Sequence, residues 1–211
     1  LTDTLAQSKA AGRPWQVLGN QVVTARVRGP QIDRMMPPEQ VADLLAGLPA
    51  DIRAQVEASI QLFKLGLPFN LDSWDGYPAA RERLYAAFKI AGVEPIVLAG
   101  DSHAFWVNEL HDDAGERRAV EFGTSSISSP SPADSIGGLP LGLALMAANS
   151  KEVKFCDQSS KGFVLLTLER EQATAELRAV STITAKPYRA STVKRYRVAR
   201  TVWGLGPLQE A

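Results

Sequence analysis

The chain has 211 residues, of which 45% are hydrophobic, and its 23 Lys and Arg residues balance its 23 Asp and Glu residues. This length is sufficient for one domain with a substantial core. Because the formal net charge is zero, no overall field draws the chain to nucleic acid or to an anionic membrane, and neither is expected as a specific partner. No apolar stretch is long enough to span a bilayer. The single cysteine, Cys156, excludes an internal disulfide and leaves the redox compartment open.

The first residues carry neither an initiating Met nor an apolar signal segment. Leu1 and Leu5 lie one helical turn apart, and Gly12 follows as a stop signal, which predicts a short opening helix. We interpret the chain as a piece of a longer polypeptide.

Hydrophobic periodicity and turn residues predict a mixture of helices and strands along the rest of the chain. Helices are expected over 37–45, 51–65, 78–91 and 141–149, the first two as an insertion-like arm. Strands are expected over 15–23, 96–99, 106–111, 118–123, 153–156, 163–169 and 173–180, the last two as a hairpin. This order indicates a single domain over 1–211 of mixed α/β (α+β) class, with 186–211 as a possible extended C-terminal arm.

An apolar run over 95–99 ends in Gly100, Asp101, Ser102 and His103. If this segment is extended, the side chains of Asp101 and His103 project to the same face, roughly 6.6 Å apart. Carboxylate and imidazole groups are the usual ligands of hydrolytic centres that contain Zn, Mn, Fe or Ca. In open α/β sheets, ligands gather at the carboxyl ends of the strands, where this pair falls. The alternative is an ordinary turn after a strand.

Two further groups of polar residues are weaker candidates for a site. Asn20 and Gln21 end the first expected strand and could position a phosphate or a metal-bound water, although polar residues at strand ends are common. Trp74, Asp75 and Tyr77 could form the rim of a pocket, but Asp75 could equally cap the helix that follows. The sequence contains no phosphate-binding P-loop, no G-x-S-x-G elbow and no Cys cluster.

Four blocks, in this order, resemble the C-terminal half of the PhoD-like alkaline phosphatases, which are metallophosphoesterases. They are W-Q-V-L-G-N-Q at 15–21, D-S-W-D-G-Y-P-A-A-R-E-R at 72–83, V-L-A-G-D-S-H at 97–103, and E-F at 121–122 followed by S-I-S-S at 126–129. The W-D-G-Y-P and G-D-x-H blocks together are specific, and the resemblance extends over nearly all of the chain.

The resemblance implies a two-sheet sandwich flanked by helices that hydrolyses phosphate monoesters and especially diesters with metal ions such as Fe and Ca. Asp101 and His103 match the family's terminal metal-binding motif and would be metal ligands. Asn20, Gln21, Trp74, Asp75 and Tyr77 would then contact substrate or support the ligands. The resemblance also implies export to the periplasm or beyond.

The family's N-terminal half carries the remaining ligand motifs, and none of them occurs in this sequence. Two metal ions need about six or more protein ligands, whereas the chain has two histidines. We therefore expect the chain to supply part of a multi-metal centre, with the missing N-terminal half of the same protein as its partner. The alternative is a non-catalytic fragment or binding module that is inactive on its own.

Overall fold

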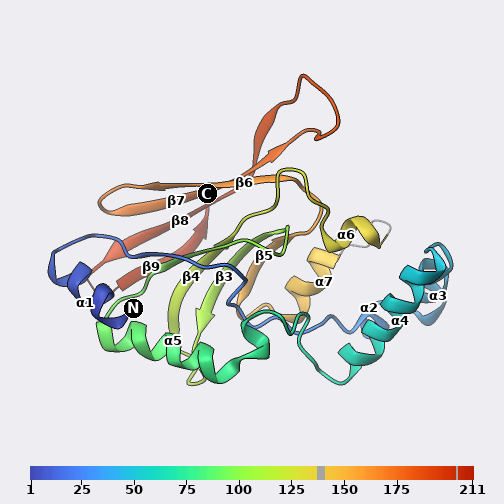
Figure 1. The fold of residues 1–211 in the computed structure, drawn as a ribbon, viewed down its shortest axis with the longest axis horizontal. Helices are drawn as coiled ribbons and strands as arrows, with labels where there is room; N and C mark the ends of the chain where they lie inside the picture. Colours follow the sequence, from blue (N-terminus) through green and yellow to red (C-terminus); the bar gives the residue numbers. More distant parts are fainter. Residues whose placement is uncertain (137–140, 203) are drawn as a thin grey trace.

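The computed structural model describes residues 1–136, 141–202 and 204–211 and contains two β-sheets and a set of helices (Figure 1). The helices are α1 (Thr2–Ala10), α2 (Ile32–Met35), α3 (Pro38–Ala46), α4 (Ala50–Lys64), α5 (Pro78–Ala91), α6 (Pro132–Ser135) and α7 (Leu141–Ala148), with a 3₁₀ turn, η1 (Trp74–Gly76). The strands are β1 (Val17–Gly19), β2 (Ile96–Ala99), β3 (Phe105–His111), β4 (Arg117–Gly123), β5 (Val153–Asp157), β6 (Gly162–Leu168), β7 (Gln172–Val180), β8 (Ala190–Thr201) and β9 (Gly204–Glu210). The mixed α/β class is confirmed.

The first sheet has five strands in the order β1-β2-β4-β3-β5. Strands β1, β2 and β4 are parallel, whereas β3 runs antiparallel to both β4 and β5. The predicted first strand, 15–23, is much shorter in the structure, since pairing with β2 ends at Gly19. The Asn20 side chain then donates to Val22 O at 2.7 Å, which turns the chain away from the sheet.

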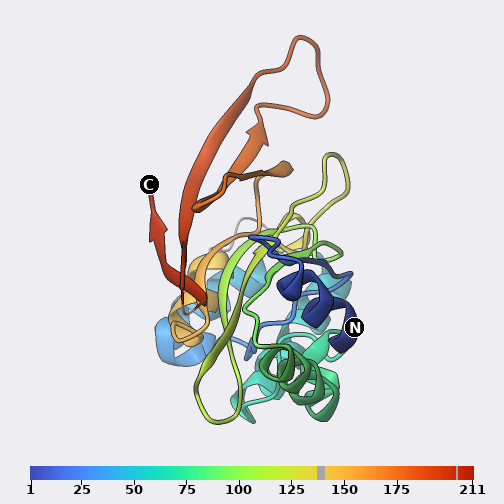
Figure 2. The ribbon, with the colours of Figure 1, turned by 90° about the vertical axis from the view of Figure 1, so that its left-hand side faces the viewer.

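The second sheet is antiparallel, with the order β6-β7-β8-β9. Strands β6 and β7 form the predicted hairpin in continuous register from Gly162↔Ala179 to Leu168↔Ala173. The sequence predicts the stretch 186–211 as a possible extended arm. In the structure this stretch contains β8, an inner strand of the second sheet, and β9, one of its edge strands. The connection between β7 and β8 projects beyond the body of the molecule (Figure 2).

Two hydrophobic cores lie on opposite faces of the first sheet. Alternation along β4 directs Ala119 to one core and Val120 and Phe122 to the other. One core lies between the two sheets, and the other lies under α1, α5 and α7. Helix α5 supplies Tyr85, Phe88 and Ala91 to the second core. It starts at a proline, and it stops at Gly92, whose φ of 63° is left-handed.

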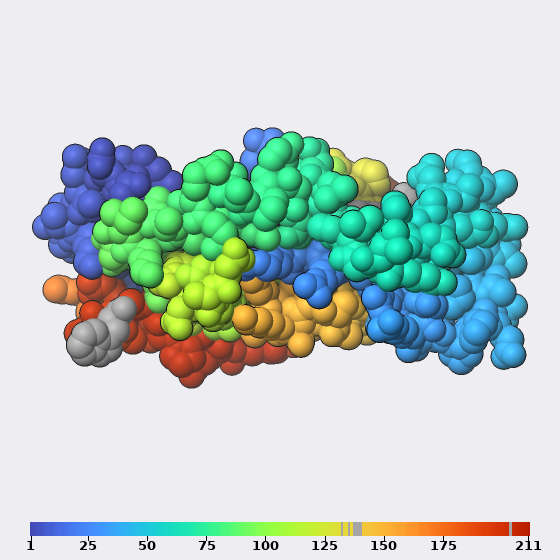
Figure 3. All heavy atoms as spheres, turned by 90° about the horizontal axis from the view of Figure 1, so that it is seen from below, coloured from blue at the N-terminus to red at the C-terminus, as the bar shows by residue number. Residues whose placement is uncertain are grey.

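Helices α3 and α4 are the two helices of the expected arm, and the short α2, which was not predicted, precedes them; together they form the arm at one end of an elongated molecule (Figure 3). Helix α3 has no buried residue, and α4 buries Ile60 alone among its residues. The arm therefore contributes little to either core. In the described part of the chain, no helix has the length and apolarity that crossing a membrane requires.

Candidate metal centre

The carboxyl ends of β1, β2 and β4 meet at one edge of the first sheet, because these three strands are parallel. The Gly100 N–H donates to Gln21 O at 3.1 Å, and the Thr124 N–H donates to Ala99 O at 2.8 Å. We call the loops that follow these strands, residues 20–21, 100–103 and 124–126, the carboxyl edge. The predicted ligands Asp101 and His103 lie at its centre.

The backbone at this pair differs from the expected geometry. Asp101 has a φ of 61° and His103 a φ of 52°, so the segment is left-handed at both positions and is not extended. The predicted extended spacing of the two side chains is therefore wrong. Left-handed backbone is unfavourable for residues other than glycine, although Asp and His adopt it more readily than most. Strain of this kind gathers at functional sites, where the surrounding structure holds it.

The His103 ring is held by the loop that follows β4. Its Nδ1 lies 2.7 Å from Pro130 O, and a carbonyl oxygen can only accept, so Nδ1 carries the proton. The other ring nitrogen, Nε2, then has a free lone pair, which is the arrangement of metal-binding histidines. The Ser125 hydroxyl lies 2.6 Å from Ser160 O and 3.2 Å from His103 O, which ties the backbone of the pair to the neighbouring loop.

The Asp101 side chain is exposed, and its carboxylate has no hydrogen bond or ion pair within the described residues. A carboxylate without a partner in the described residues and an imidazole whose Nδ1 is engaged are groups of the kind that bind metal ions, and here they lie two positions apart in one loop. The described residues contain no group of three or more His, Cys, Asp or Glu side chains placed to hold a metal. The pair therefore fits part of a metal centre and not a complete one.

Asn20 and Gln21 also lie at the carboxyl edge. The Asn20 amide is engaged locally, since Nδ2 donates to Val22 O and to Thr24 Oγ1, and Oδ1 accepts from the Gln21 N–H. Gln21 is exposed, and its backbone carbonyl binds Gly100 directly before Asp101. Of these two side chains, Gln21 is the exposed one, and no hydrogen bond within the described residues engages it.

Trp74, Asp75 and Tyr77 lie on η1 and at the start of α5, and no described contact joins them to Asp101 or His103. The Asp75 side chain is 8% exposed, and Oδ1 accepts from Arg81 at 2.5 Å. Its Oδ2 accepts from the Val27 N–H at 2.7 Å. The structure thus gives Asp75 two structural partners.

Asp75 belongs to a wider set of hydrogen-bond acceptors whose shared role the sequence did not reveal. The segment 24–28 crosses the helix-covered face of the first sheet, and each of its five backbone N–H groups donates to a side chain rather than to a strand. We call Asp75, Glu121, Asn149 and Glu152 the acceptor set, because they accept these five hydrogen bonds at 2.7–3.3 Å. A sequence signal exists: a charged residue and an amide, Glu121 and Asn108, interrupt apolar strands.

Glu121 is fully buried and faces Asn108 across the β3–β4 ladder. It accepts from Thr24 N, Ala25 N and Asn108 Nδ2. Burial raises the pKa of this carboxyl, and the three donors offset part of that effect. Burial also raises the pKa of the Cys156 thiol to about 12, which disfavours the reactive thiolate.

Comparisons with known proteins agree with this architecture. A family model described as PhoD-like phosphatase matches residues 1–177. Over 60 residues, which are 28% of this chain and 10% of the relative, the chain is 40% identical to Alkaline phosphatase D of Bacillus subtilis (strain 168). The solved "Structure of PhoD" matches with a TM-score of 0.64 at 21% identity, covering 100% of this chain and 34% of that chain.

The chain therefore spans about a third of the solved structure that it matches, and at this identity the likeness shows a shared fold. The family match is broader, because it extends over well more than half of the chain and includes the carboxyl edge. On this evidence the chain belongs to the PhoD-like phosphatases, a family of hydrolases.

Proposed function

We propose that this chain contributes to a metal-dependent phosphoric ester hydrolase that cleaves phosphate monoesters and diesters. Asp101 and His103 are two ligands of a multi-metal centre, and Fe and Ca are the proposed ions, by resemblance to the family. A periplasmic or secreted location is part of the same proposal and is supported by that resemblance alone.

The observation that carries the proposal is the arrangement of His103. Its Nδ1 is bound to Pro130 O, which orients the ring and leaves Nε2 as a ligand, and Asp101, two positions earlier, has a carboxylate without a partner in the described residues. Both residues have left-handed backbone at the end of a central parallel strand, where α/β proteins place their ligands. A turn without function has no need for this combination of features.

When bound, the metal ions would supply an activated water and positive charge that stabilises the phosphoryl oxygens. Asp101 would hold them through carboxylate oxygens and His103 through Nε2. The Gln21 side chain would donate or accept a hydrogen bond at the substrate or at a bound water. Asn20 would position Gln21, because its Oδ1 accepts from the Gln21 N–H at 3.0 Å.

The remaining ligands would come from other parts of a longer PhoD-like polypeptide, since the described residues offer no third ligand next to the pair. We therefore expect the 211-residue chain alone to hydrolyse phosphodiesters weakly or not at all. Turnover by this chain alone in metal-replete buffer would overturn that part of the proposal.

The test compares Asp101→Ala and His103→Ala in a polypeptide that includes the missing part. Bound metal, measured by elemental analysis, and hydrolysis of bis-p-nitrophenyl phosphate should fall together, because each variant removes one ligand. Unchanged metal content in either variant would remove that residue from the centre.

His111→Ala is a matched control for the histidine. The Nδ1 of His111 also lies near a backbone carbonyl, 3.0 Å from Glu109 O, but the residue lies six positions beyond the start of β3, about 20 Å along the strand. Metal content and activity should be unchanged in this variant. Equal losses in both histidine variants would point to unfolding instead of lost coordination.

The second candidate is a non-catalytic binding module, and it is favoured by the lack of a third ligand in the described residues. Elemental analysis separates the two functions. A chain that copurifies with a complementary piece and stoichiometric metal is part of an enzyme, whereas a stable, metal-free monomer is not.

A further inference from the structure

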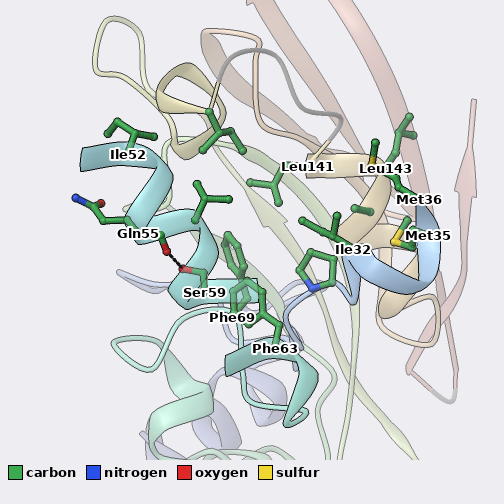
Figure 4. A pocket seen from close by; sticks show the side chains of 14 residues that line it. Ile32, Met35, Met36, Ile52, Gln55, Ser59, Phe63, Phe69, Leu141 and Leu143 are labelled. Atoms are coloured by element: carbon green, nitrogen blue, oxygen red, sulfur yellow. Dashed lines mark hydrogen bonds between the residues drawn. The ribbon is translucent and has the colours of Figure 1, made fainter. Parts of the chain in front are cut away.

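The loop that carries both proposed ligands crosses the end of a neighbouring strand. Strand β4 lies between β2 and β3 in the first sheet, so residues 100–104, which connect β2 to β3, pass the carboxyl end of β4. We call residues 100–103 the ligand loop. The pocket between α4 and α7, shown in Figure 4, is lined mostly by apolar side chains such as Ile52 and Leu141, and by no residue of the ligand loop. Other contacts therefore hold this loop in place.

Ser102, the residue between the two proposed ligands, is bound to a buried tryptophan. The Trp106 Nε1 donates to Ser102 Oγ at 2.9 Å, and Trp106 is 2% exposed. The hydrogen bonds of the carboxyl edge hold the backbone of the ligand loop at Gly100 and His103. The bond from Trp106 holds the residue between these points, and it comes from the core.

The indole of Trp106 is itself held closely by the first sheet. Trp106 on β3 pairs with Gly123 on β4, and a Cβ at Gly123 would come within 2.9 Å of both Cβ and Cδ1 of Trp106. The indole therefore lies against the backbone of the glycine, and a larger residue there would displace it. Because Cδ1 and Nε1 are bonded neighbours in the indole ring, this close contact restricts the position of the donor atom.

The backbone around Ser102 depends on such contacts. Asp101 and His103, on either side of it, both have left-handed backbone, which is unfavourable for these residues and persists only where the surrounding structure holds it. Loss of the bond from Trp106 would give Ser102 more freedom and would change the relative placement of the two proposed ligands. Metal sites need their ligands within about 0.5 Å of the binding geometry.

We propose that Trp106 is a positioning residue of the metal centre and acts through Ser102 on Asp101 and His103. This inference rests on the proposed function, because it requires these two residues to be ligands. The role of Trp106 is indirect: its indole N–H keeps the ligand loop in the conformation that binds the ions.

The test uses Ser102→Ala and Trp106→Phe in a polypeptide that includes the missing part. Ser102→Ala removes the acceptor, and Trp106→Phe keeps an aromatic ring but removes the N–H donor. Each variant is dialysed against increasing concentrations of EDTA, and bound metal is measured by elemental analysis. The EDTA concentration that removes half of the metal should fall roughly three- to tenfold in each variant, which is the size expected for the loss of one hydrogen bond.

Two further measurements separate positioning from a general loss of stability. The double variant should lose its metal at the same EDTA concentration as the single variants, because both substitutions break the same hydrogen bond. Excess metal should restore hydrolysis of bis-p-nitrophenyl phosphate in both single variants, since the ligands themselves are intact.

Trp15→Phe is the matched control for the tryptophan. The Trp15 Nε1 also donates to an oxygen, Glu169 O at 2.5 Å, but Trp15 precedes β1 and so lies at the amino end of that strand. Metal retention should be unchanged in this variant. A loss equal to that of Trp106→Phe would overturn the proposal, because metal retention would then follow stability.

Unchanged metal retention in Ser102→Ala would overturn the proposal, and so would a double variant whose loss is the product of the two single losses. If Trp106→Phe does not fold by circular dichroism, Ser102→Thr replaces it. This variant keeps the hydroxyl and should retain metal, and a loss as large as that of Ser102→Ala would count against the role of the hydrogen bond. Failure of the proposed function gives a different result, since Asp101→Ala and His103→Ala would then leave bound metal unchanged, and the positioning role would fall with it.

Discussion

Asp75 and Asp101 show how differently two regions of this molecule use the same side chain. Asp75, in the acceptor set, is almost fully buried and binds both Arg81 and a backbone N–H. Asp101, at the carboxyl edge, is exposed, has no partner in the described residues and has left-handed backbone. The first carboxylate stabilises the fold, while the second is available to a ligand at some cost to the fold.

The same contrast extends to the neighbours of each residue. The acceptor set satisfies five consecutive N–H groups of a buried segment that pairs with no named strand, which is necessary because unpaired buried donors are costly. At the carboxyl edge, hydrogen bonds instead fix the orientation of His103 and leave Nε2 open. Removing a side chain of the acceptor set should therefore reduce stability, whereas removing the exposed Asp101 carboxylate from the carboxyl edge should not.

The largest effect is expected for Asp75→Ala. The substitution leaves the Arg81 guanidinium, whose side chain is 5% exposed, without its counter-charge and leaves the Val27 N–H without an acceptor. Breaking a buried ion pair in this way costs about 3–5 kcal/mol. Urea denaturation of the 211-residue chain measures the loss in the free energy of unfolding.

Asp72→Ala is the control for this prediction, because Asp72 is exposed and lies three residues away. Its effect should stay within about 0.5 kcal/mol. The double variant Asp75→Leu, Arg81→Met should cost less than Asp75→Ala, since it removes both charges. If Asp72→Ala and Asp75→Ala lowered the free energy of unfolding by similar amounts, the buried ion pair of Asp75 and Arg81 would not stabilise the fold more than an exposed side chain does.

A smaller loss is expected for Glu121→Gln. The amide keeps one oxygen for the Thr24 or Ala25 N–H but presents its own donors to the remaining N–H groups. A buried donor left without an acceptor costs about 1–3 kcal/mol. Glu171→Gln, on an exposed hairpin, is the control and should be neutral. A neutral Glu121→Gln would mean that the segment 24–28 does not need this carboxylate.

The pH dependence of the Glu121→Gln effect tests how the buried carboxyl titrates. Burial raises the pKa of Glu121 in the folded chain above its ordinary value of 4.5. The contribution of this carboxyl to the free energy of unfolding is therefore fully present below pH 4.5, and it is lost as the pH rises through the raised pKa. The stability gap between the unmodified chain and Glu121→Gln should therefore narrow with rising pH. A gap that widens would show that the three donors lower the pKa more than burial raises it.

The sequence predicted most of the fold because its helices and strands are bounded by strong local signals. Pro78 and Gly92 delimit α5, and the apolar run at 96–99 coincides with β2. The position of Asp101 and His103 at the carboxyl end of a strand was also expected, and the structure adds that β1 and β2 are parallel, which brings Asn20 and Gln21 to the same edge. The family was recognisable from the same blocks of residues.

The sequence did not predict features that depend on contacts between distant residues. Asp101 and His103 have left-handed backbone, and His103 is held by contacts with Ser125 and Pro130, which lie in a loop more than twenty positions later. Likewise, Asp75 could have been a rim residue of a pocket or a structural residue. Only the path of the segment 24–28 shows that its partners are Arg81 and the Val27 N–H. No local pattern encodes that path.

The smallest effect, and the most direct test of the contrast, is expected for Asp101. Asn also adopts left-handed backbone, so Asp101→Asn should change the free energy of unfolding by less than about 0.5 kcal/mol.

Asp101→Gly removes the conformational cost at φ 61° and should be neutral or stabilising by up to about 1 kcal/mol, because the relief of strain exceeds the added freedom of the unfolded chain. Urea denaturation of the metal-free chain measures both changes. A loss of more than about 1 kcal/mol in either variant would mean that Asp101 stabilises the fold as Asp75 does, and the contrast between the two regions would no longer hold.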